Sequence, residues 1–287
     1  MRFEKWQALG NDYVIVEQED LPFALTPARI RRLCEGHFGI YADGILEISR
    51  PQDPAHVADL RIFNPDGSEA ELSGNGAREA ILYLRRRGWT TEDAFAIHTI
   101  AGTIRPTITG PSSCRVDMGQ AHLRSRDFPD GPADGSGSVL AGGRQWSFRH
   151  VSIGNPQCAI QVSSDAELAA LALGSIGPEI EANAQFPNRS NVSWYTELSP
   201  GHIRARIFER GVGETLSSGT GACGAAVAYL QLRPDAPLGQ PVSVVLDGGE
   251  LEVEVGDDLR VHLAGWALPV FEGRLSEPFV DELRQTA

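Results

Sequence analysis

The chain has 287 residues, of which 41% are apolar and 22% are charged, and its formal net charge at pH 7 is -13. These proportions are those of soluble globular proteins, and the length allows two domains of ordinary size. The negative charge argues against nucleic acid and anionic membrane surfaces as partners, and no apolar run is long enough to span a bilayer. Because the N-terminus lacks the apolar core of a signal peptide, we expect a cytoplasmic protein.

The cysteines and histidines give no sign of a metal centre. The four cysteines are scattered and form no CxxC pair, which argues against a zinc site and against a disulfide framework. The seven histidines show no HExxH or similar spacing. We therefore expect no bound metal.

The first half of the chain alternates strand and helix patterns. Thr26-Pro27 is a good helix start, with threonine as the N-cap and proline at the first helical position. The expected elements are a strand at 13–16 after the polar turn at 10–12, a helix from residue 27, a strand at 45–48, a helix at about 74–87 that Gly88 ends, and strands near 95–100, 103–108 and 114–118.

In the second half, residues 128–143 are rich in Gly, Pro, Asp and Ser, which predicts a loop or linker. The other expected elements are a strand pair within 146–162, a short helix capped by Asp165, a helix at about 222–232, strands near 242–246, 251–255 and 259–263, and a last helix from Ser276.

An internal repeat indicates two similar halves. The segment at 61–77, RIFNPDGSEAELSGNGA, aligns without a gap with the segment at 206–222, RIFERGVGETLSSGTGA. Each copy is followed by a helix and by alternating strands, so each half is built round one central helix. We predict an α+β fold whose halves are 1–118 with about 268–287, and 119–267, with the site between them.

Each repeat ends in a glycine-rich turn that opens a helix. A helix N-terminus leaves backbone N–H groups unpaired and carries partial positive charge, and glycine lets a ligand approach that backbone closely. Two such turns facing one cleft would bind a carboxylate and stabilise negative charge beside it. The plainer interpretation is that Ser73 and Ser218 are only helix N-caps.

Several motifs together resemble the diaminopimelate epimerase family over nearly the whole chain. They are Leu9-Gly10-Asn11-Asp12-Tyr13, Ala42-Asp43-Gly44, Phe63-Asn64, Gly74-Asn75-Gly76-Ala77-Arg78, Gly154-Asn155-Pro156, Glu209-Arg210-Gly211-Val212-Gly213-Glu214-Thr215 and Gly219-Thr220-Gly221-Ala222-Cys223. The resemblance implies two pseudo-symmetric halves, each a strongly curved, mostly antiparallel sheet round a central helix. Proline racemases and PhzF-type isomerases share this fold. It also implies chemistry without a cofactor, in which two cysteines handle the α-proton on opposite faces of the substrate.

The chain departs from this family at the catalytic positions. Ser73 and Ser218 replace the two cysteines, Gln157 replaces a histidine, and Tyr41 stands where the family has glycine. Serine acts as a base or nucleophile only when another group activates it. A laboratory exchange of both cysteines to trap substrate would not explain Gln157 or Tyr41, which favour natural divergence.

The resemblance also implies how a substrate is held. Five residues match those that bind the distal amino-acid end in the family: Asn64, Asn155, Asn191, Glu209 and Arg210. Asn11 and Asn75 match positions that line the reacting end. At the two helix starts, we expect Gly74, Gly219 and Thr220 to contribute to substrate binding, with the substrate carboxylate at the helix N-termini. Arg210 can pair with a carboxylate and Glu209 with an ammonium group, although an isolated Glu–Arg pair is more often solvated.

We therefore expect a cofactor-independent isomerase of a small amino-acid-derived carboxylate, in specialised biosynthesis such as that of antibiotic building blocks. The reaction would be a double-bond shift or an altered epimerisation. Diaminopimelate epimerase in a Ser/Ser form and a catalytically inactive amino-acid-binding homologue are the alternatives. The base stays open among Tyr41, Asp43, Glu47 and a water held by Ser73 and Ser218. The partner is a small molecule, and a homodimer is left open.

Overall fold

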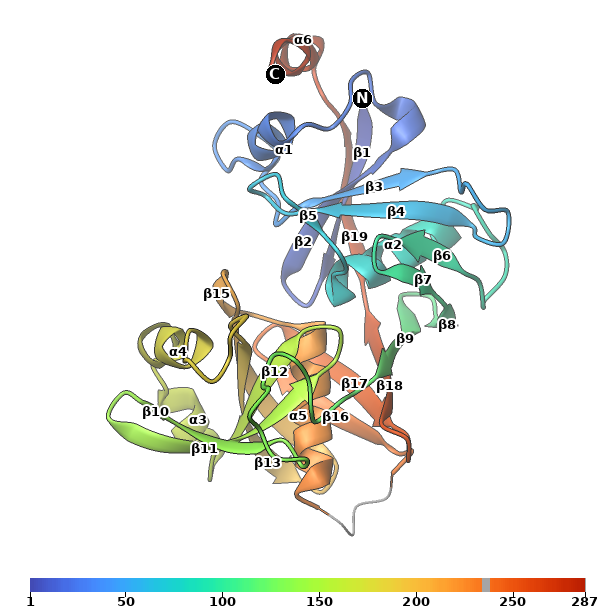
Figure 1. Ribbon diagram of the computed structural model, residues 1–287. Coiled ribbons are helices and arrows are strands. Elements are labelled where there is room, and N and C mark those ends of the chain that lie inside the picture. The colour runs from blue at the N-terminus through green and yellow to red at the C-terminus, as the bar shows by residue number, and fades with distance from the viewer. Residues whose placement is uncertain (234–237, 287) are drawn as a thin grey trace. The chain divides into compact units, whose positions relative to one another are not determined.

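The computed structural model describes residues 1–233 and 238–286. Its chain divides into two compact units, which are described separately here (Figure 1). Unit 1 comprises Met1–Val116 and Trp266–Ala287, and unit 2 comprises Asp117–Gly265. Among the described residues, no helix is long and apolar enough to cross a membrane.

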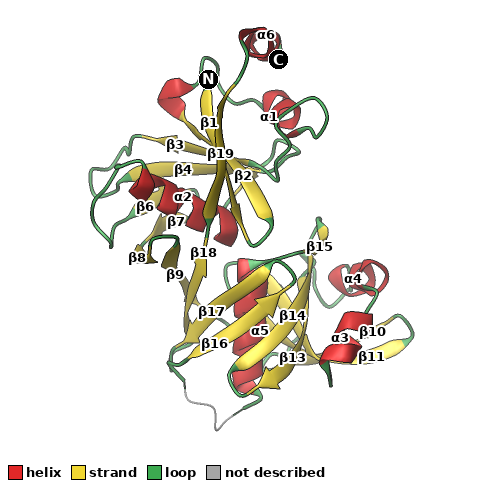
Figure 2. Cartoon of the chain, turned by 180° about the vertical axis from the view of Figure 1, so that it is seen from behind, coloured by secondary structure: helices red, strands yellow, loops and turns green. Residues whose placement is uncertain are grey.

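Unit 1 is a mostly antiparallel sheet that packs against one central helix (Figure 2). The strand order is β19-β1-β2-β3-β4-β6-β7, and β5 pairs with β4. The central helix α2 contacts β1, β2 and β3. The elements are β1 (Arg2–Ala8), β2 (Asn11–Glu17), a short 3-10 turn (Gln18–Asp20), α1 (Pro27–Cys34), β3 (Ile45–Ser49), β4 (Ala58–Phe63), β5 (Glu69–Ala70), α2 (Gly74–Arg86), β6 (Ile97–Thr99), β7 (Gly102–Ile104), β8 (Pro106–Gly110), β9 (Ser113–Gln120), β19 (Leu268–Arg274) and α6 (Glu277–Gln285).

Unit 2 repeats this plan round helix α5. The strand order is β10-β11-β12-β13-β14-β16-β17-β18, continuing to β9 and β8, and β15 pairs with β14. The elements are β10 (Ser136–Ala141), β11 (Arg144–Ser152), β12 (Pro156–Gln161), α3 (Asp165–Ala170), α4 (Leu173–Glu181), β13 (Asn191–Ser199), β14 (His202–Glu209), β15 (Gly213–Thr215), α5 (Gly219–Gln231), β16 (Pro241–Leu246), β17 (Gly249–Val255) and β18 (Arg260–Trp266). The predicted α+β class is confirmed.

Helix α5 consists mostly of small and apolar residues, as expected for a helix that strands surround. Eleven of its residues are buried, from Gly219 to Leu230, which is typical of a helix without a solvent face. Its glycines permit close packing. A Cβ at Gly221 would lie 2.9 Å from Ile207 Cδ1, and one at Gly224 would lie 2.8 Å from Gln157 Cβ. The helix therefore presses its first turns against the strands that carry candidate site residues.

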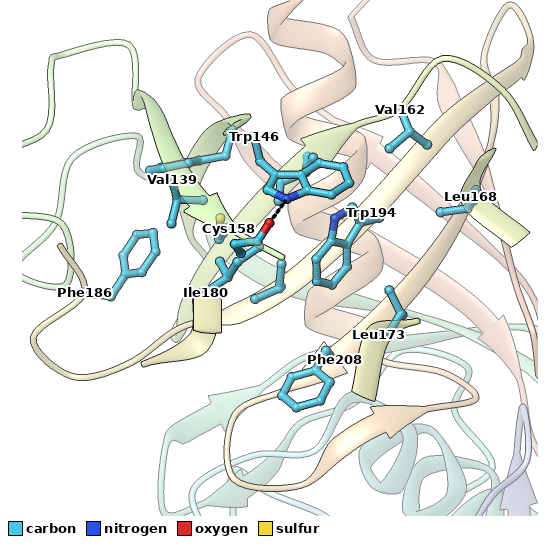
Figure 3. Close-up of a cluster of buried hydrophobic side chains, with 14 of the residues drawn as sticks. Val139, Trp146, Cys158, Val162, Leu168, Leu173, Ile180, Phe186, Trp194 and Phe208 are labelled. Carbon is cyan, nitrogen blue, oxygen red and sulfur yellow. Dashed lines mark hydrogen bonds between the residues drawn. The ribbon is translucent and has the colours of Figure 1, made fainter. Parts of the chain in front are cut away.

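Unit 2 also has a cluster of buried hydrophobic side chains that joins residues of α3 and α4 to residues of the strands (Figure 3). Trp146 and Trp194 meet edge to face with ring centroids 6.3 Å apart, and Phe208 belongs to the same cluster. The Trp146 indole N–H donates to the Ala141 carbonyl at 3.1 Å, so its one polar atom is satisfied. Alternate residues of β13 thus serve this core and the α5 face.

The prediction of a loop or linker across 128–143 is wrong in its second part, because β10 forms there and pairs with β11. Val139 and Ala141 are buried, whereas Leu140 between them is 63% exposed. Gly142 and Gly143 both have positive φ, of 58° and 71°, as a two-residue hairpin turn with the native twist requires. The glycine pair was therefore a hairpin signal rather than a linker signal.

Candidate active site

In unit 1 the Ser73 hydroxyl lies where β2 meets the start of α2. Its oxygen accepts the Gly76 backbone N–H at 3.1 Å and the Tyr13 phenol O–H at 3.2 Å. The Tyr13 ring packs so closely on Gly44 that a Cβ there would lie 2.6 Å from Tyr13 Cε1. We call Ser73 with Tyr13 and the first turn of α2 the Ser73 site. Ser73 is therefore an N-cap, as the plainer interpretation held, and it also has a phenolic partner.

A series of hydrogen bonds between polar side chains extends from the same turn. Asn75 donates to Asn11 Oδ1 at 3.1 Å, and Asn11 donates to Asp43 Oδ2 at 2.7 Å. The buried Arg78 donates to Asn75 Oδ1 at 2.6 Å. Asp43 Oδ2 also accepts the Asp12 backbone N–H at 3.0 Å. The structure thus brings Asn11, Asn75 and Asp43 together, and Asp43 is engaged in fixing the loops.

Tyr41 occupies a conformation that favours glycine. Its φ is 61°, a left-handed value that costs a side chain strain, and its side chain is 66% exposed. Lys5 donates to its carbonyl oxygen, and its ring packs on Gly36. Among the described residues, no hydrogen bond joins the Tyr41 side chain to Ser73. Tyr41 therefore lies on an exposed loop, two residues from Asp43.

The remaining unit 1 candidates bind elsewhere. Leu46 faces Gly76 of α2, so its neighbour Glu47 points to the other face of the sheet. There the Glu47 carboxylate pairs with Arg61 at 3.1 Å, which removes it from the candidate bases. Asn64 donates to Ser68 within its own turn at 3.0 Å.

In unit 2 the Ser218 hydroxyl is bound to a carboxylate. Its oxygen accepts the Gly221 backbone N–H at 3.2 Å, and its proton is donated to Glu209 Oε2 at 3.1 Å. Thr215 donates to the other oxygen, Oε1, at 3.0 Å. Burial raises the pKa of Glu209, and the bonds from Thr215 and Ser218 oppose that rise. We call these residues, with the first turn of α5, the Ser218 site.

An amide cluster lies beside the same helix start. Gln157 donates from Nε2 to Asn155 Oδ1 at 2.7 Å and to Thr220 Oγ1 at 3.2 Å. Asn155 also donates to Thr220 Oγ1 at 3.2 Å. Gln157 is fully buried, and its Oε1 has no hydrogen-bond partner among the residues that the structure describes. Three predicted residues are thus in mutual contact, and none of them is a base at neutral pH.

Asn191 and Arg210 form a separate connection. Asn191 Oδ1 accepts the Arg210 backbone N–H at 2.9 Å, and Asn191 Nδ2 donates to the Pro156 carbonyl at 3.0 Å. The exposed Arg210 side chain donates to the Asn188 carbonyl at 2.9 Å. Glu209 and Arg210 therefore bind different partners instead of each other.

Sequence reasoning missed Tyr13, Thr215 and the basic role open to Glu209. Tyr13 and Thr215 both lie inside motifs that were recognised, but nothing in the pattern says which hydroxyl faces which acceptor. Within the described part of the chain, no group of three or more His, Cys, Asp or Glu residues could hold a metal ion.

Glu79, inside α2, makes the free energy of unfolding depend on pH. It is fully buried, and neither carboxyl oxygen has a side-chain partner in the described residues. Burial raises the pKa of Glu79 well above its usual range, while the Arg78 guanidinium and the Tyr13 backbone N–H oppose the rise. The folded protein therefore favours the protonated form.

Glu79→Gln should stabilise the protein above the pKa of an unfolded glutamate and have little effect below it. The unfolded chain releases the proton near its ordinary pKa, whereas the folded chain keeps it, so folding of the parent loses free energy as pH rises. We expect a gain of about 1 kcal/mol, the usual scale for a buried unsatisfied polar group. Urea unfolding at pH 4.5 and pH 8 measures it, and equal effects at both would contradict it.

Comparison with known proteins gives a consistent result. The family model of diaminopimelate epimerase matches residues 3–124 and 149–265. Diaminopimelate epimerase from Synechococcus sp. (strain JA-3-3Ab) is 38% identical over 285 residues, covering 96% of this chain and 99% of that protein. The enzyme from Desulforudis audaxviator (strain MP104C) is 40% identical over 284 residues, with coverage of 96% and 99%.

Solved structures with the same fold are more distant in sequence. A probable proline racemase from Agrobacterium radiobacter has a TM-score of 0.71 at 14% identity, covering 98% of this chain and 95% of its own. A PhzF-family protein from Bacillus anthracis has a TM-score of 0.66 at 18% identity, with 96% and 99%. A methylitaconate-delta-isomerase has a TM-score of 0.64 at 14% identity, with 96% and 95%. At this identity they show the fold alone.

Proposed function

Because the chain belongs to the diaminopimelate epimerase family, and is thus an isomerase of the racemase and epimerase type, we propose that it moves a proton on a small amino-acid-derived carboxylate. We propose further that the proton returns to a different carbon, which shifts a double bond. The observation that carries this proposal is the hydrogen bond between Ser218 and Glu209.

The two helix starts support a carboxylate as the recognised group. Both α2 and α5 begin with a serine N-cap followed by glycine, which leaves the first turn open to a ligand. Backbone N–H groups at such a start bind anions, and the helix dipole adds partial positive charge. The same donors would stabilise the enolate-like charge that develops when a proton leaves a carbon next to the carboxylate.

The nature of the base supports the double-bond shift. In the Ser218 site the acceptor at the end of the hydrogen-bond chain is a carboxylate, whose ordinary pKa is about 4.3, against about 8.5 for a thiol. Burial strengthens Glu209 as a base, but it starts from this lower value. A weaker base needs a more acidic C–H group. A hydrogen allylic to a double bond that is conjugated with a carboxylate or iminium meets that need.

The fold is compatible with such chemistry, since one protein that shares it is named as a delta-isomerase. We place the substrate among unsaturated amino-acid derivatives of specialised biosynthesis, such as antibiotic building blocks. Ser73 and Ser218 support this placement, because they stand at the two positions where the family resemblance implies cysteines.

A second candidate is diaminopimelate epimerisation by a Ser/Ser form. The identity of 38% over nearly the whole of a diaminopimelate epimerase favours it. A third is an inactive protein that only binds an amino acid. The three differ in what happens to hydrogen on the substrate, so one type of experiment separates them.

The test is incubation in deuterated water with unsaturated proline-like and anthranilate-like acids, and separately with diaminopimelate, followed by NMR. We expect the double bond to move in an unsaturated acid. If Glu209 exchanges its proton with solvent, deuterium should appear at the carbon of the product that receives the proton. Rapid α-deuteration of diaminopimelate with inversion, and no reaction of the unsaturated acids, would show epimerisation instead. Saturable binding without exchange in any compound would show a binding protein.

The variant with Ser73→Cys and Ser218→Cys is the matched control for a trapped epimerase. We expect it to stay far below the activity of a cysteine-containing diaminopimelate epimerase assayed beside it, because Gln157 and Tyr41 also differ from the family. Full recovery of epimerase activity from these two changes would overturn the proposed double-bond shift.

A further inference from the structure

Tyr41 stands at a position where the stability of the fold does not explain a tyrosine. Its backbone φ is 61°, in the left-handed region where a side chain costs conformational strain. The residue is 66% exposed, so burial of the ring offsets little of that strain. Glycine would adopt the same backbone conformation without strain. A strained and exposed residue of this kind points to a role in binding or chemistry.

Backbone contacts hold the Tyr41 conformation without help from its side chain. The Ile40 N–H donates to the Leu33 carbonyl at 2.7 Å, which ties the loop to the end of α1. Lys5 donates from Nζ to the Tyr41 carbonyl oxygen. Because these bonds involve only the main chain of the loop, the loop can keep its shape with another residue at position 41.

The Tyr41 ring is held on one side and is otherwise open to solvent. A Cβ at Gly36 would lie 2.9 Å from Tyr41 Cδ2, so the ring lies directly against the glycine backbone. The Lys5 ammonium lies 5.5 Å from the ring centroid, within the range of a cation–π contact. Lys5 is itself buried and pairs with Asp12 at 3.0 Å. An aromatic ring that is both fixed and exposed can stack on a flat ligand.

Two residues after Tyr41, the same loop joins the hydrogen-bond series that reaches the first turn of α2. The Asp43 N–H donates to the Asp12 carbonyl at 2.9 Å, and the Asp43 carboxylate accepts Asn11 Nδ2 at 2.7 Å. Asn11 in turn accepts from Asn75 at 3.1 Å. The ring, this series and the start of α2 all belong to unit 1, so their arrangement is defined within one compact unit.

We propose that the Tyr41 ring binds the flat, unsaturated part of the substrate by stacking, and so selects planar ring acids over saturated ones. This step rests on the proposed function and narrows its substrate class to small acids whose conjugated ring lies next to the carboxylate. A flat π-system can lie on the tyrosine ring with many atoms in contact, whereas a puckered saturated ring touches it at few.

The test uses two probes, anthranilate and its saturated counterpart 2-aminocyclohexanecarboxylate, with binding measured by titration calorimetry. The parent protein should bind anthranilate more tightly. Tyr41→Phe keeps the ring and should keep this preference. Tyr41→Asn removes the ring, and asparagine tolerates a positive φ better than most side chains. It should raise the Kd of anthranilate about fivefold, the scale of one aromatic stacking contact, and leave the Kd of the saturated acid unchanged.

Thermal unfolding separates stacking from a structural role. Because asparagine relieves the strain, Tyr41→Asn should not lower the midpoint of unfolding. Phe38→Ala is the matched control. Phe38 lies in the same loop and is 68% exposed, but its ring lies beside Arg32 of α1, with the guanidinium 5.7 Å from the ring centroid. This change should leave both dissociation constants as they are in the parent protein.

Four outcomes overturn the inference. They are a parent protein that binds both acids equally or neither, a loss of the preference in Tyr41→Phe, a loss in Tyr41→Asn that is equal for both acids or comes with a lower unfolding midpoint, and the same loss in Phe38→Ala. The proposed function fails separately, if no double bond moves in any unsaturated acid. That measurement follows turnover and this one follows binding, so the two failures are distinguishable.

Discussion

Glu209→Gln is expected to lower kcat by about 10³-fold, the middle of the range for losing a general base, and to leave the protein folded. The amide oxygen can still accept one of the two hydroxyl protons, from Ser218 or from Thr215, and the amide NH2 can donate to the other hydroxyl oxygen, so the local packing is kept. It cannot take up a proton from Ser218, so removal of the substrate hydrogen stops. Both the conversion rate and the substrate deuterium exchange should fall together, which NMR in deuterated water measures.

Glu214→Gln is the matched control for this variant. Glu214 lies five residues further on, in β15, and pairs with Arg206 instead of with Ser218. The same chemical change there should leave kcat within about twofold, as for surface substitutions in general. In the parent protein kcat should fall with acidification through the raised pKa of Glu209, because the base must be ionised. Equal losses in both variants would contradict the assignment of Glu209 as the base.

Trp194→Ala is expected to destabilise unit 2 by about 3–5 kcal/mol, because it empties the centre of a packed cluster. The side chain is fully buried against Trp146 and lies on the face of β13 away from α5 (Figure 3). A loss of this size is a large share of the stability of an ordinary domain. Urea unfolding followed by the fluorescence of the remaining tryptophans measures it.

Trp194→Phe provides the comparison, since it keeps an aromatic ring in the cluster and should cost less than half as much. The ordering of the two variants tests packing rather than the loss of one hydrogen bond, because the Trp194 indole nitrogen has no partner among the described residues. A loss below about 1 kcal/mol for Trp194→Ala would mean that the cluster closes over the gap.

The fold was predictable where a local signal and the repeat agreed. The aligned copies ending at Ala77 and Ala222 placed a capped helix at the centre of each half, and α2 and α5 occupy those places. The prediction was poorest where burial contradicts composition. Strand β1 contains Glu4 and Lys5, both buried, so it lacks the alternation that indicates a strand. The pairing that buries them involves β19, which is more than 250 residues away in the chain.

The site was predictable as a set of residues but not as a set of roles. The asparagine network round Asn11 and Asn75, and the contact of Gln157 with Thr220, join residues that motif matching had selected. The link from Glu209 to Ser218 depends on the tight return between β14 and β15, where Glu209 pairs with Gly213. No sequence pattern gives the direction of a hydroxyl proton, and that direction separates the two serines.

The first strand of the chain also has a consequence for synthesis on the ribosome. In the sheet of unit 1, β1 lies between β2 and β19, so residues 2–8 need residues 268–274 to complete their pairing. The ribosome delivers these partners at opposite ends of translation. Residues 117–265 hold their own strands from β10 to β17 and their central helix, so they can fold while the last segment is still being made. The edge of β1 then stays open until termination, and a nascent chain stalled before residue 268 would present it to chaperones or to another nascent chain on the same message.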